Sequence, residues 1–213
     1  MRTLAAALLL AASLAAPGSA HEAHEAAAPK YQAPPPGSYE LPPIDRVADH
    51  VLLGVDGAPA PLLDLADGEA ALVSFVYLSC GEACPLATAT LHRVDRLLAG
   101  DAGLAPRVKL VTVSFDPQRD TPERMAALAH NLRPKGRWEF LTAAGPDALA
   151  PVLADFGQDA VWVPEAEASE RLRHVLKLFL VDDQGRVRNI YSTGLLDERL
   201  VINDLRTVTG VIP

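Results

Sequence analysis

The sequence predicts a single α/β domain in which helices flank a mixed central sheet on both faces. Two near-continuous apolar runs, at 71–78 and 108–115, have the composition of strands that are buried on both sides. Helical patterns alternate with strand patterns through the middle of the chain. A strand–turn–strand pattern and a last helix then close it, which adds antiparallel pairing to the parallel part of the sheet.

Composition excludes several classes of protein. The chain has 213 residues, of which 49% are hydrophobic and 22% charged, so it is too apolar to be mainly disordered and long enough for one substantial core. The net charge of −8, without a strong Lys/Arg cluster, argues against a nucleic-acid partner. Two cysteines exclude both a disulfide framework and a four-cysteine zinc site.

The N-terminal residues predict export. Arg2 precedes an apolar run at 4–16, and Gly18-Ser19-Ala20 forms a small-x-small cleavage site, so residues 1–20 are predicted to be a cleavable secretory signal peptide. The apolar run is shorter than the roughly 20 residues of a spanning helix. We therefore expect a periplasmic or otherwise exported protein, which could associate with a membrane only through an uncleaved N-terminus.

Residues 21–45 are predicted to form a flexible tether, because they are rich in proline. The folded domain is expected to span 46–213. Its first elements are an extra N-terminal β-hairpin with an Asp56-Gly57 turn, and then the strand at 71–78. Apolar residues at helical spacing then predict a helix over 85–99.

The second half of the domain continues the alternation. After the strand at 108–115, Thr121-Pro122-Glu123 combines a cap, a first-turn proline and an acid, which predicts the start of a helix. The further predictions are a strand at 138–142, a helix at 147–156, an irregular stretch at 158–172, strands at 175–181 and 187–191, and a helix at 197–208. This order is compatible with a thioredoxin-like domain.

The two cysteines are the chief candidates for chemistry. Cys80 and Cys84 directly follow the strand at 71–78 and open the next helix, where the helix dipole favours thiolates. A disulfide that closes this five-residue loop would remove only roughly 2 kcal/mol from the unfolded state, against about 4.7 kcal/mol for a 100-residue loop. A structural staple is therefore less favoured than thiol–disulfide exchange or binding of a soft metal ion, and both of these remain open.

A metal ion would need a third ligand from elsewhere in the chain. His174 lies where an irregular segment leads into the strand at 175–181, and a side chain there can project over a neighbouring site. Asp116 ends a strand at the same sheet edge as Cys80, where it could be a turn residue or an outer-shell group that tunes the site. Three further histidines fit surface or packing roles better: His50, His92 and His130.

Together these segments resemble the SCO/SenC family of copper-binding thioredoxin-like proteins, which take part in assembly of the cytochrome oxidase copper centre. The matching pieces, found over about 45–208, are Phe75 to Pro85 with its C-x-x-x-C-P pattern, Val113 to Glu123 with D-P-x-x-D-T-P, and His174 before Leu178 to Gly185. The resemblance implies that Cys80, Cys84 and His174 bind copper. It also implies delivery of the copper to a respiratory oxidase copper-site subunit or another copper protein.

The chemistry of these residues fits the implied ligand set. Two thiolates and one neutral imidazole suit copper, with a site charge of −1 for Cu(I) and zero for Cu(II). In an exported protein the thiols tend to oxidise, so a thiol reductant partner is expected. Two other functions remain open: a thiol–disulfide reductase in which Cys80 attacks and Cys84 resolves, and a binding module with a structural disulfide.

Two further features bear on copper. His21 and His24 would lie at the new N-terminus after cleavage, where imidazoles and the α-amine can capture copper, although a solvated tail is favoured. Arg173 precedes His174 at a position where family members commonly carry an acid. Its positive charge would lie beside the proposed ligand.

Overall fold

A computed structural model describes residues 33–79, 83–158, 161–164, 170–173, 177–192 and 196–212. All of them belong to one compact unit, Ala33–Pro213. The predicted signal peptide and the first part of the predicted tether lie outside the described residues. Within the described residues, no helix has both the length and the apolar character that membrane crossing requires.

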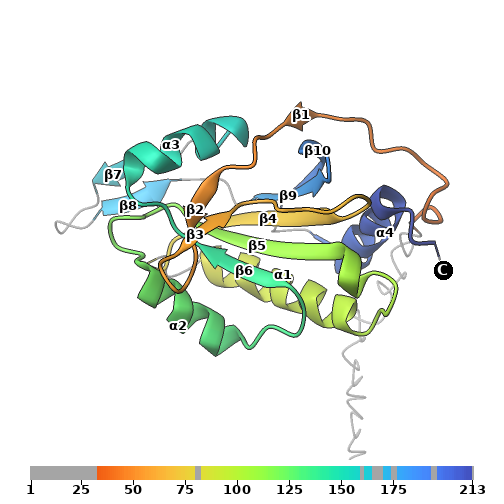
Figure 1. Ribbon diagram of the computed structural model, residues 1–213, viewed down its shortest axis with the longest axis horizontal. Coiled ribbons are helices and arrows are strands. Elements are labelled where there is room, and N and C mark those ends of the chain that lie inside the picture. Colours follow the sequence, from red (N-terminus) through yellow and green to blue (C-terminus); the bar gives the residue numbers. More distant parts are fainter. Residues whose placement is uncertain are drawn as a thin grey trace, which may run out of the picture. The chain divides into compact units, whose positions relative to one another are not determined.

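A six-stranded mixed sheet organises the domain, in the order β1-β10-β9-β4-β5-β6 (Figure 1). The strands β4, β5 and β6 run parallel to one another, whereas β9 and β10 pair antiparallel next to β4. Their bounds are β1 Asp45–Arg46, β4 Ala70–Val76, β5 Val108–Ser114, β6 Trp138–Leu141, β9 Lys177–Asp182 and β10 Arg186–Ser192. The prediction of a mixed sheet is therefore confirmed.

The central strands are buried on both faces, as their continuous apolar runs predict. All seven residues of β4 and all seven of β5 are buried. Alternate residues point to two cores: Leu72 and Leu110 face one of them, Val73 and Val111 the other. The sheet is thus the middle layer of a three-layer domain.

Helices cover both faces of this sheet (Figure 1). One core contains buried residues from α1 (Ala83–Ala99), α2 (Pro122–Leu132) and α4 (Glu198–Thr209). The opposite core contains Leu149 and Val152 of α3 (Pro146–Asp155). Flanking helices on both faces match the thioredoxin-like fold class that the sequence predicts.

The extra N-terminal hairpin is present. Strand β2 (Val51–Leu53) pairs antiparallel with β3 (Pro59–Pro61), and Gly57 in the turn has a φ of +76°, which glycine adopts without strain. Leu52 is buried in the core, and the Leu53 amide donates to the Thr142 carbonyl at 2.8 Å. The hairpin is therefore fixed to the end of β6.

Part of the stretch that we expect to be irregular is a second hairpin, so that expectation is wrong for these residues. Strand β7 (Val161–Pro164) pairs antiparallel with β8 (Glu170–Arg173) in a sheet of its own. The sequence of β8, Glu-Arg-Leu-Arg, has one apolar residue and hence no alternation to detect. Its strand conformation comes from pairing with β7.

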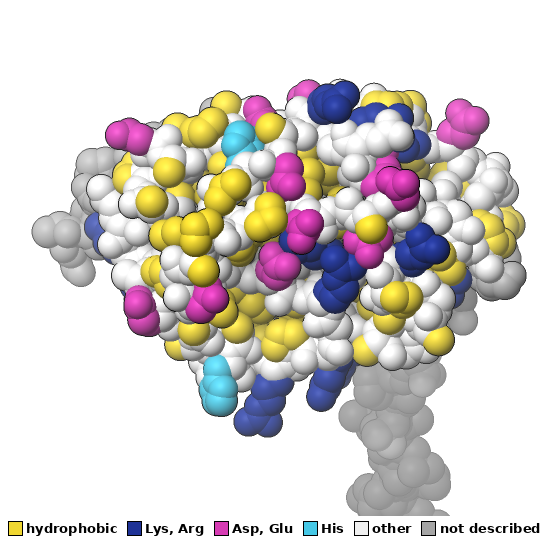
Figure 2. Space-filling view, in the orientation of Figure 1, with side chains coloured by type: hydrophobic (Ala, Val, Ile, Leu, Met, Phe, Trp, Pro, Cys, Tyr) yellow, Lys and Arg dark blue, Asp and Glu magenta, His cyan; other side chains and the backbone are white. Residues whose placement is uncertain are grey.

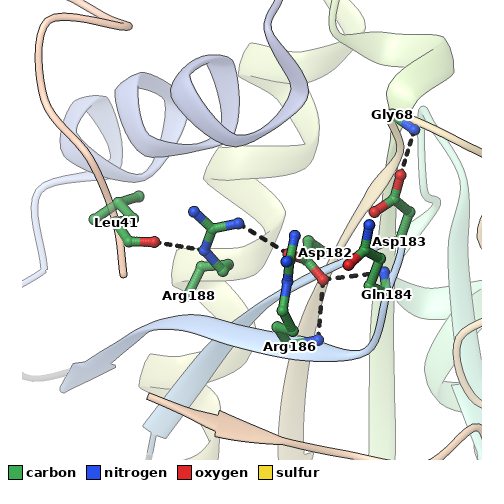
Figure 3. A network of polar contacts seen from close by, with 7 residues as sticks. All are labelled: Leu41, Gly68, Asp182, Asp183, Gln184, Arg186 and Arg188. Atoms are coloured by element: carbon green, nitrogen blue, oxygen red, sulfur yellow. Dashed lines mark hydrogen bonds and ion pairs between the residues drawn. The ribbon is translucent and has the colours of Figure 1, made fainter. Parts of the chain in front are cut away.

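Residues 34–46 lie along the rest of the domain. The Gly37 amide donates to the Thr207 hydroxyl at 3.0 Å, and the Ile44 amide donates to the Val187 carbonyl at 2.8 Å. The Arg188 guanidinium bonds both the Leu41 carbonyl and Asp182, which ties this segment to the β9–β10 turn (Figure 3). These contacts hold the second half of the predicted tether against α4 and β10.

Candidate metal centre

The C-terminal ends of β4 and β5 define the edge where the cysteines are expected. Val76 and Ser114 are paired neighbours at the ends of these parallel strands, and the Phe115 amide donates to the Val76 carbonyl at 2.7 Å. Cys80 follows four residues after the end of β4 and lies outside the described residues. Cys84 is the second residue of α1, so the backbone places it in the first turn of the helix.

Asp116 lies at this edge, as the sequence predicts. It follows β5 by two residues and is only 3% exposed. Its carboxylate accepts a bond from the Arg119 guanidinium at 3.1 Å, and its amide donates to the Ser114 hydroxyl at 2.9 Å. An outer-shell role toward the thiols remains a prediction.

Asp120 is the residue whose contact the sequence interpretation missed. Its Oδ2 accepts bonds from the Leu78 amide at 3.0 Å and from the Ser114 hydroxyl at 2.7 Å. The first of these bonds joins the loop after β5 to a residue two positions before Cys80. The only sequence signal was the second aspartate of D-P-x-x-D-T-P, which also fits a turn or capping role.

Burial dominates the electrostatics of Asp120. Its side chain is 1% exposed, and desolvation raises the pKa of the carboxyl above its ordinary value, although the Ser114 and Leu78 hydrogen bonds oppose this. The Arg124 guanidinium lies 3.6 Å from Oδ1. The edge therefore holds two buried carboxylates, each with a partly exposed arginine beside it.

The part of the chain that carries Cys84 and the two arginines is basic. Residues 83–137 contain nine Lys/Arg and five Asp/Glu, whereas the whole chain has a net charge of −8. Figure 2 shows acidic and basic side chains mixed across the middle of the face in view, with further Lys/Arg and a His projecting along the edge where Figure 1 draws α1 and α2. Five of these cations form ion pairs with acids within the described residues, among them Arg119 with Asp116 and Arg124 with Asp120, so much of this positive charge is locally compensated.

His174 follows β8 by one residue and lies outside the described residues. In Figure 1 the β7–β8 hairpin lies toward the end of the sheet to which β5 and β6 run. The hairpin ends on Arg173, which is paired with Val161. Assignment of His174 as a ligand remains a prediction.

Two of the other histidines lie in settings that do not require a metal ion. His50 Nε2 lies 2.8 Å from Asp155 Oδ2, and the pKa of Asp155 is lowered by the Ala48 amide and by His50. His130 lies in the last turn of α2. Among the described residues, which leave out Cys80 and His174, no group of three or more metal-ligating side chains occurs. Within that part of the chain, no alternative centre competes with the predicted one.

A helix with a cysteine in its first turn, at the edge of a mixed and doubly covered sheet, is the arrangement of a thioredoxin-like protein. The chain belongs to the SCO1/SenC family, because the family model matches residues 48–210. The family resemblance is therefore confirmed.

Individual relatives agree with this assignment. The SCO1 protein homolog of Bacillus subtilis is 25% identical over 131 residues, which cover 61% of this chain but only 65% of that protein, just under two thirds of its length. The structure of Bradyrhizobium japonicum ScoI with copper bound is 25% identical, with a TM-score of 0.61 over 74% of this chain and 95% of its own. Apo Sco1 of Thermus thermophilus is 27% identical, with a TM-score of 0.65 over 81% and 95%.

Proposed function

We propose that this protein is a copper metallochaperone that binds copper through Cys80, Cys84 and His174 and delivers it to a respiratory copper centre. The observation that carries the proposal is membership of the SCO1/SenC family together with the position of Cys84 in the first turn of α1, at the edge formed by β4 and β5. Copper in the related Bradyrhizobium japonicum ScoI supports copper as the cargo.

The proposed ligands explain both capture and release. Thiolates select a soft ion, and an imidazole completes a three-coordinate Cu(I) site. A ligand from the receiving protein can then attack the open position. Because the thiols must be deprotonated and reduced, copper binding competes with protons and with disulfide formation.

The cellular setting follows from the N-terminal sequence. We propose that residues 1–20 are cleaved on export, that the tether begins at residue 21, and that the domain over 46–213 works in the periplasm. A thiol reductant there would return the Cys80–Cys84 disulfide to the form that binds copper.

The test of the ligand set is the copper stoichiometry of the reduced protein. We expect one tightly bound copper per chain in the wild type and a large loss of affinity in His174→Ala. His130→Ala is the matched control, because His130 is exposed at the end of α2. Full affinity and an unchanged spectrum in His174→Ala would reject the three-ligand site.

A second function, thiol–disulfide reduction of a client's metal-site cysteines, is favoured by the same helix start. The first turn of α1, which Glu82 directly precedes in the sequence, holds Cys84 and no acidic residue, and the helix dipole favours a thiolate in this turn. The reductase hypothesis predicts turnover of a disulfide substrate without copper. It also predicts a mixed disulfide at Cys80 in Cys84→Ser.

A further inference from the structure

We propose that Asp120 is a positioning residue of the metal centre, whose buried carboxylate fixes the path of the chain between β4 and Cys80. The expected effect on copper affinity rests on the proposed function. The expected effect on the redox equilibrium of the cysteine pair does not depend on copper binding.

A continuous set of hydrogen bonds supports this role. The Asp116 amide donates to the Ser114 hydroxyl at 2.9 Å, and the Ser114 hydroxyl donates to Asp120 Oδ2 at 2.7 Å. The same oxygen accepts the Leu78 amide at 3.0 Å. The loop after β5 and the segment after β4 are thereby joined through one carboxylate oxygen.

Capping of α2 does not explain the carboxylate. The residue at the N-cap of α2 is Thr121, and Glu123 already supplies an acid in the first turn. The Oδ2 atom of Asp120 is instead engaged by Ser114 and Leu78. The hydrogen bonds of Asp120 therefore point toward β4 and β5, away from the helix that follows it.

The cost of this arrangement argues for a specific role. Asp120 is 1% exposed, and within the described part of the chain its Oδ1 accepts no hydrogen bond. The Arg124 guanidinium lies 3.6 Å from this oxygen, beyond hydrogen-bonding distance. Burying a carboxylate with one oxygen not hydrogen-bonded is unfavourable, and an uncharged residue could make a purely structural contact at lower cost. The carboxylate bonds a backbone amide two residues before a predicted ligand.

Restraint at Leu78 has a direct consequence for the cysteine pair. Ser79 alone separates Leu78 from Cys80, so we expect a fixed Leu78 amide to restrain the chain that leads to Cys80. A preorganised sulfur binds copper with a smaller ordering cost. It also sets how readily the pair closes into a disulfide, because disulfide geometry is narrow.

The experiment uses two readouts on the full mature chain. The first is the equilibrium of the metal-free Cys80–Cys84 pair with a glutathione redox buffer, and the second is Cu(I) affinity by competition with a chromophoric chelator. Asp120→Ala removes both accepted bonds, whereas Asp120→Asn keeps an oxygen that can accept them. Asp95→Ala is the matched control, because Asp95 is an equally buried carboxylate that accepts backbone amides, those of Lys135 and Gly136 before β6.

We expect Asp120→Ala to weaken Cu(I) binding about 10- to 100-fold, the range typical of residues that orient metal ligands. The redox equilibrium should shift in the same variant, and Asp120→Asn should recover most of both effects. If Asp120→Ala unfolds, Ser114→Ala decides instead, because it removes the hydroxyl that donates to Asp120 Oδ2, and the redox equilibrium should shift in the same direction as in Asp120→Ala.

A redox equilibrium and Cu(I) affinity within twofold of wild type in a folded Asp120→Ala, or in Ser114→Ala if that variant unfolds, would overturn the inference, as would equal or larger effects in Asp95→Ala. Failure of the wild type to bind copper would instead reject the proposed function. The redox readout would still test Asp120 in that case.

Discussion

The Tyr39 hydroxyl donates a hydrogen bond to the carboxylate of Asp204, 165 positions later in the chain. Asp204 is buried in α4 and also accepts hydrogen bonds from the Tyr191 hydroxyl at 2.7 Å and from the side-chain amide of Asn189 at 2.9 Å. One carboxylate thus joins the N-terminal segment, β10 and α4.

Replacement of Asp204 by alanine should destabilise the fold strongly. Three donors lose their acceptor, and two of these donors are tyrosine hydroxyls. A hydrogen bond to a charged group contributes about 1.5–3 kcal/mol, although such contributions to one acceptor do not add fully. We expect a loss of about 3 kcal/mol in the free energy of unfolding, measured in urea. Asp197→Ala, which removes the N-cap of the same helix, should cost only about 1 kcal/mol. Equal losses would contradict this account.

Stability should fall at alkaline pH through the same network. Burial and the bond to Asp204 raise the pKa of Tyr39 from 10.0 to about 12, so the fold favours its protonated form. The stability that this preference contributes is therefore present below pH 10 and is lost as the pH rises from 10 to 12. Tyr39→Phe should show a flatter decline in unfolding free energy over that window. Parallel curves for the two proteins would show that Tyr39 does not contribute.

Gly185 should tolerate no side chain. Its φ is +70°, and a Cβ there would lie 2.5 Å from the Val47 carbonyl oxygen. Gly57 has a similar φ of +76° with nothing near its Cβ position, so Gly57→Ala measures the conformational cost alone, about 1 kcal/mol. Gly185→Ala should cost clearly more in urea unfolding because the clash adds to the same strain. A cost equal to that of Gly57→Ala would contradict the close approach to Val47.

Lys109 should matter for stability and not for copper. Its buried Nζ lies 3.0 Å from Glu139 and donates to the Leu63 carbonyl at 2.9 Å, near the N-terminal end of β5. The candidate centre lies at the other end of that strand. Lys109→Met should therefore lower the unfolding free energy by about 1–3 kcal/mol, the usual cost of leaving a buried acceptor unpaired. Copper stoichiometry in the folded variant should be unchanged, and a loss of copper would place Lys109 in the site.

The elements that the sequence predicts well carry their signal locally. The apolar run at 71–78 predicts β4, the Asp56-Gly57 pair predicts the turn of the β2–β3 hairpin, and Thr121-Pro122 predicts the start of α2. Each of these patterns is complete within a few residues. For the same reason their boundaries agree with the structure to within two residues or so.

What the sequence does not predict depends on distant pairing. Strand β1 is two residues long and exists through its bonds to β10, and β8 is polar and exists through β7. The role of Asp120 depends on a bond to Leu78, 42 positions earlier. The edge for the metal centre could be predicted from strand order, whereas the contact that restrains it could not.

We propose that the Cys80–Cys84 pair binds copper as cargo. The most direct test is an anaerobic Cu(I) titration of the reduced protein, compared with the same protein after alkylation of both thiols. We expect one tightly bound copper per chain in the reduced protein and none at that affinity after alkylation. Tight binding that survives alkylation would contradict it.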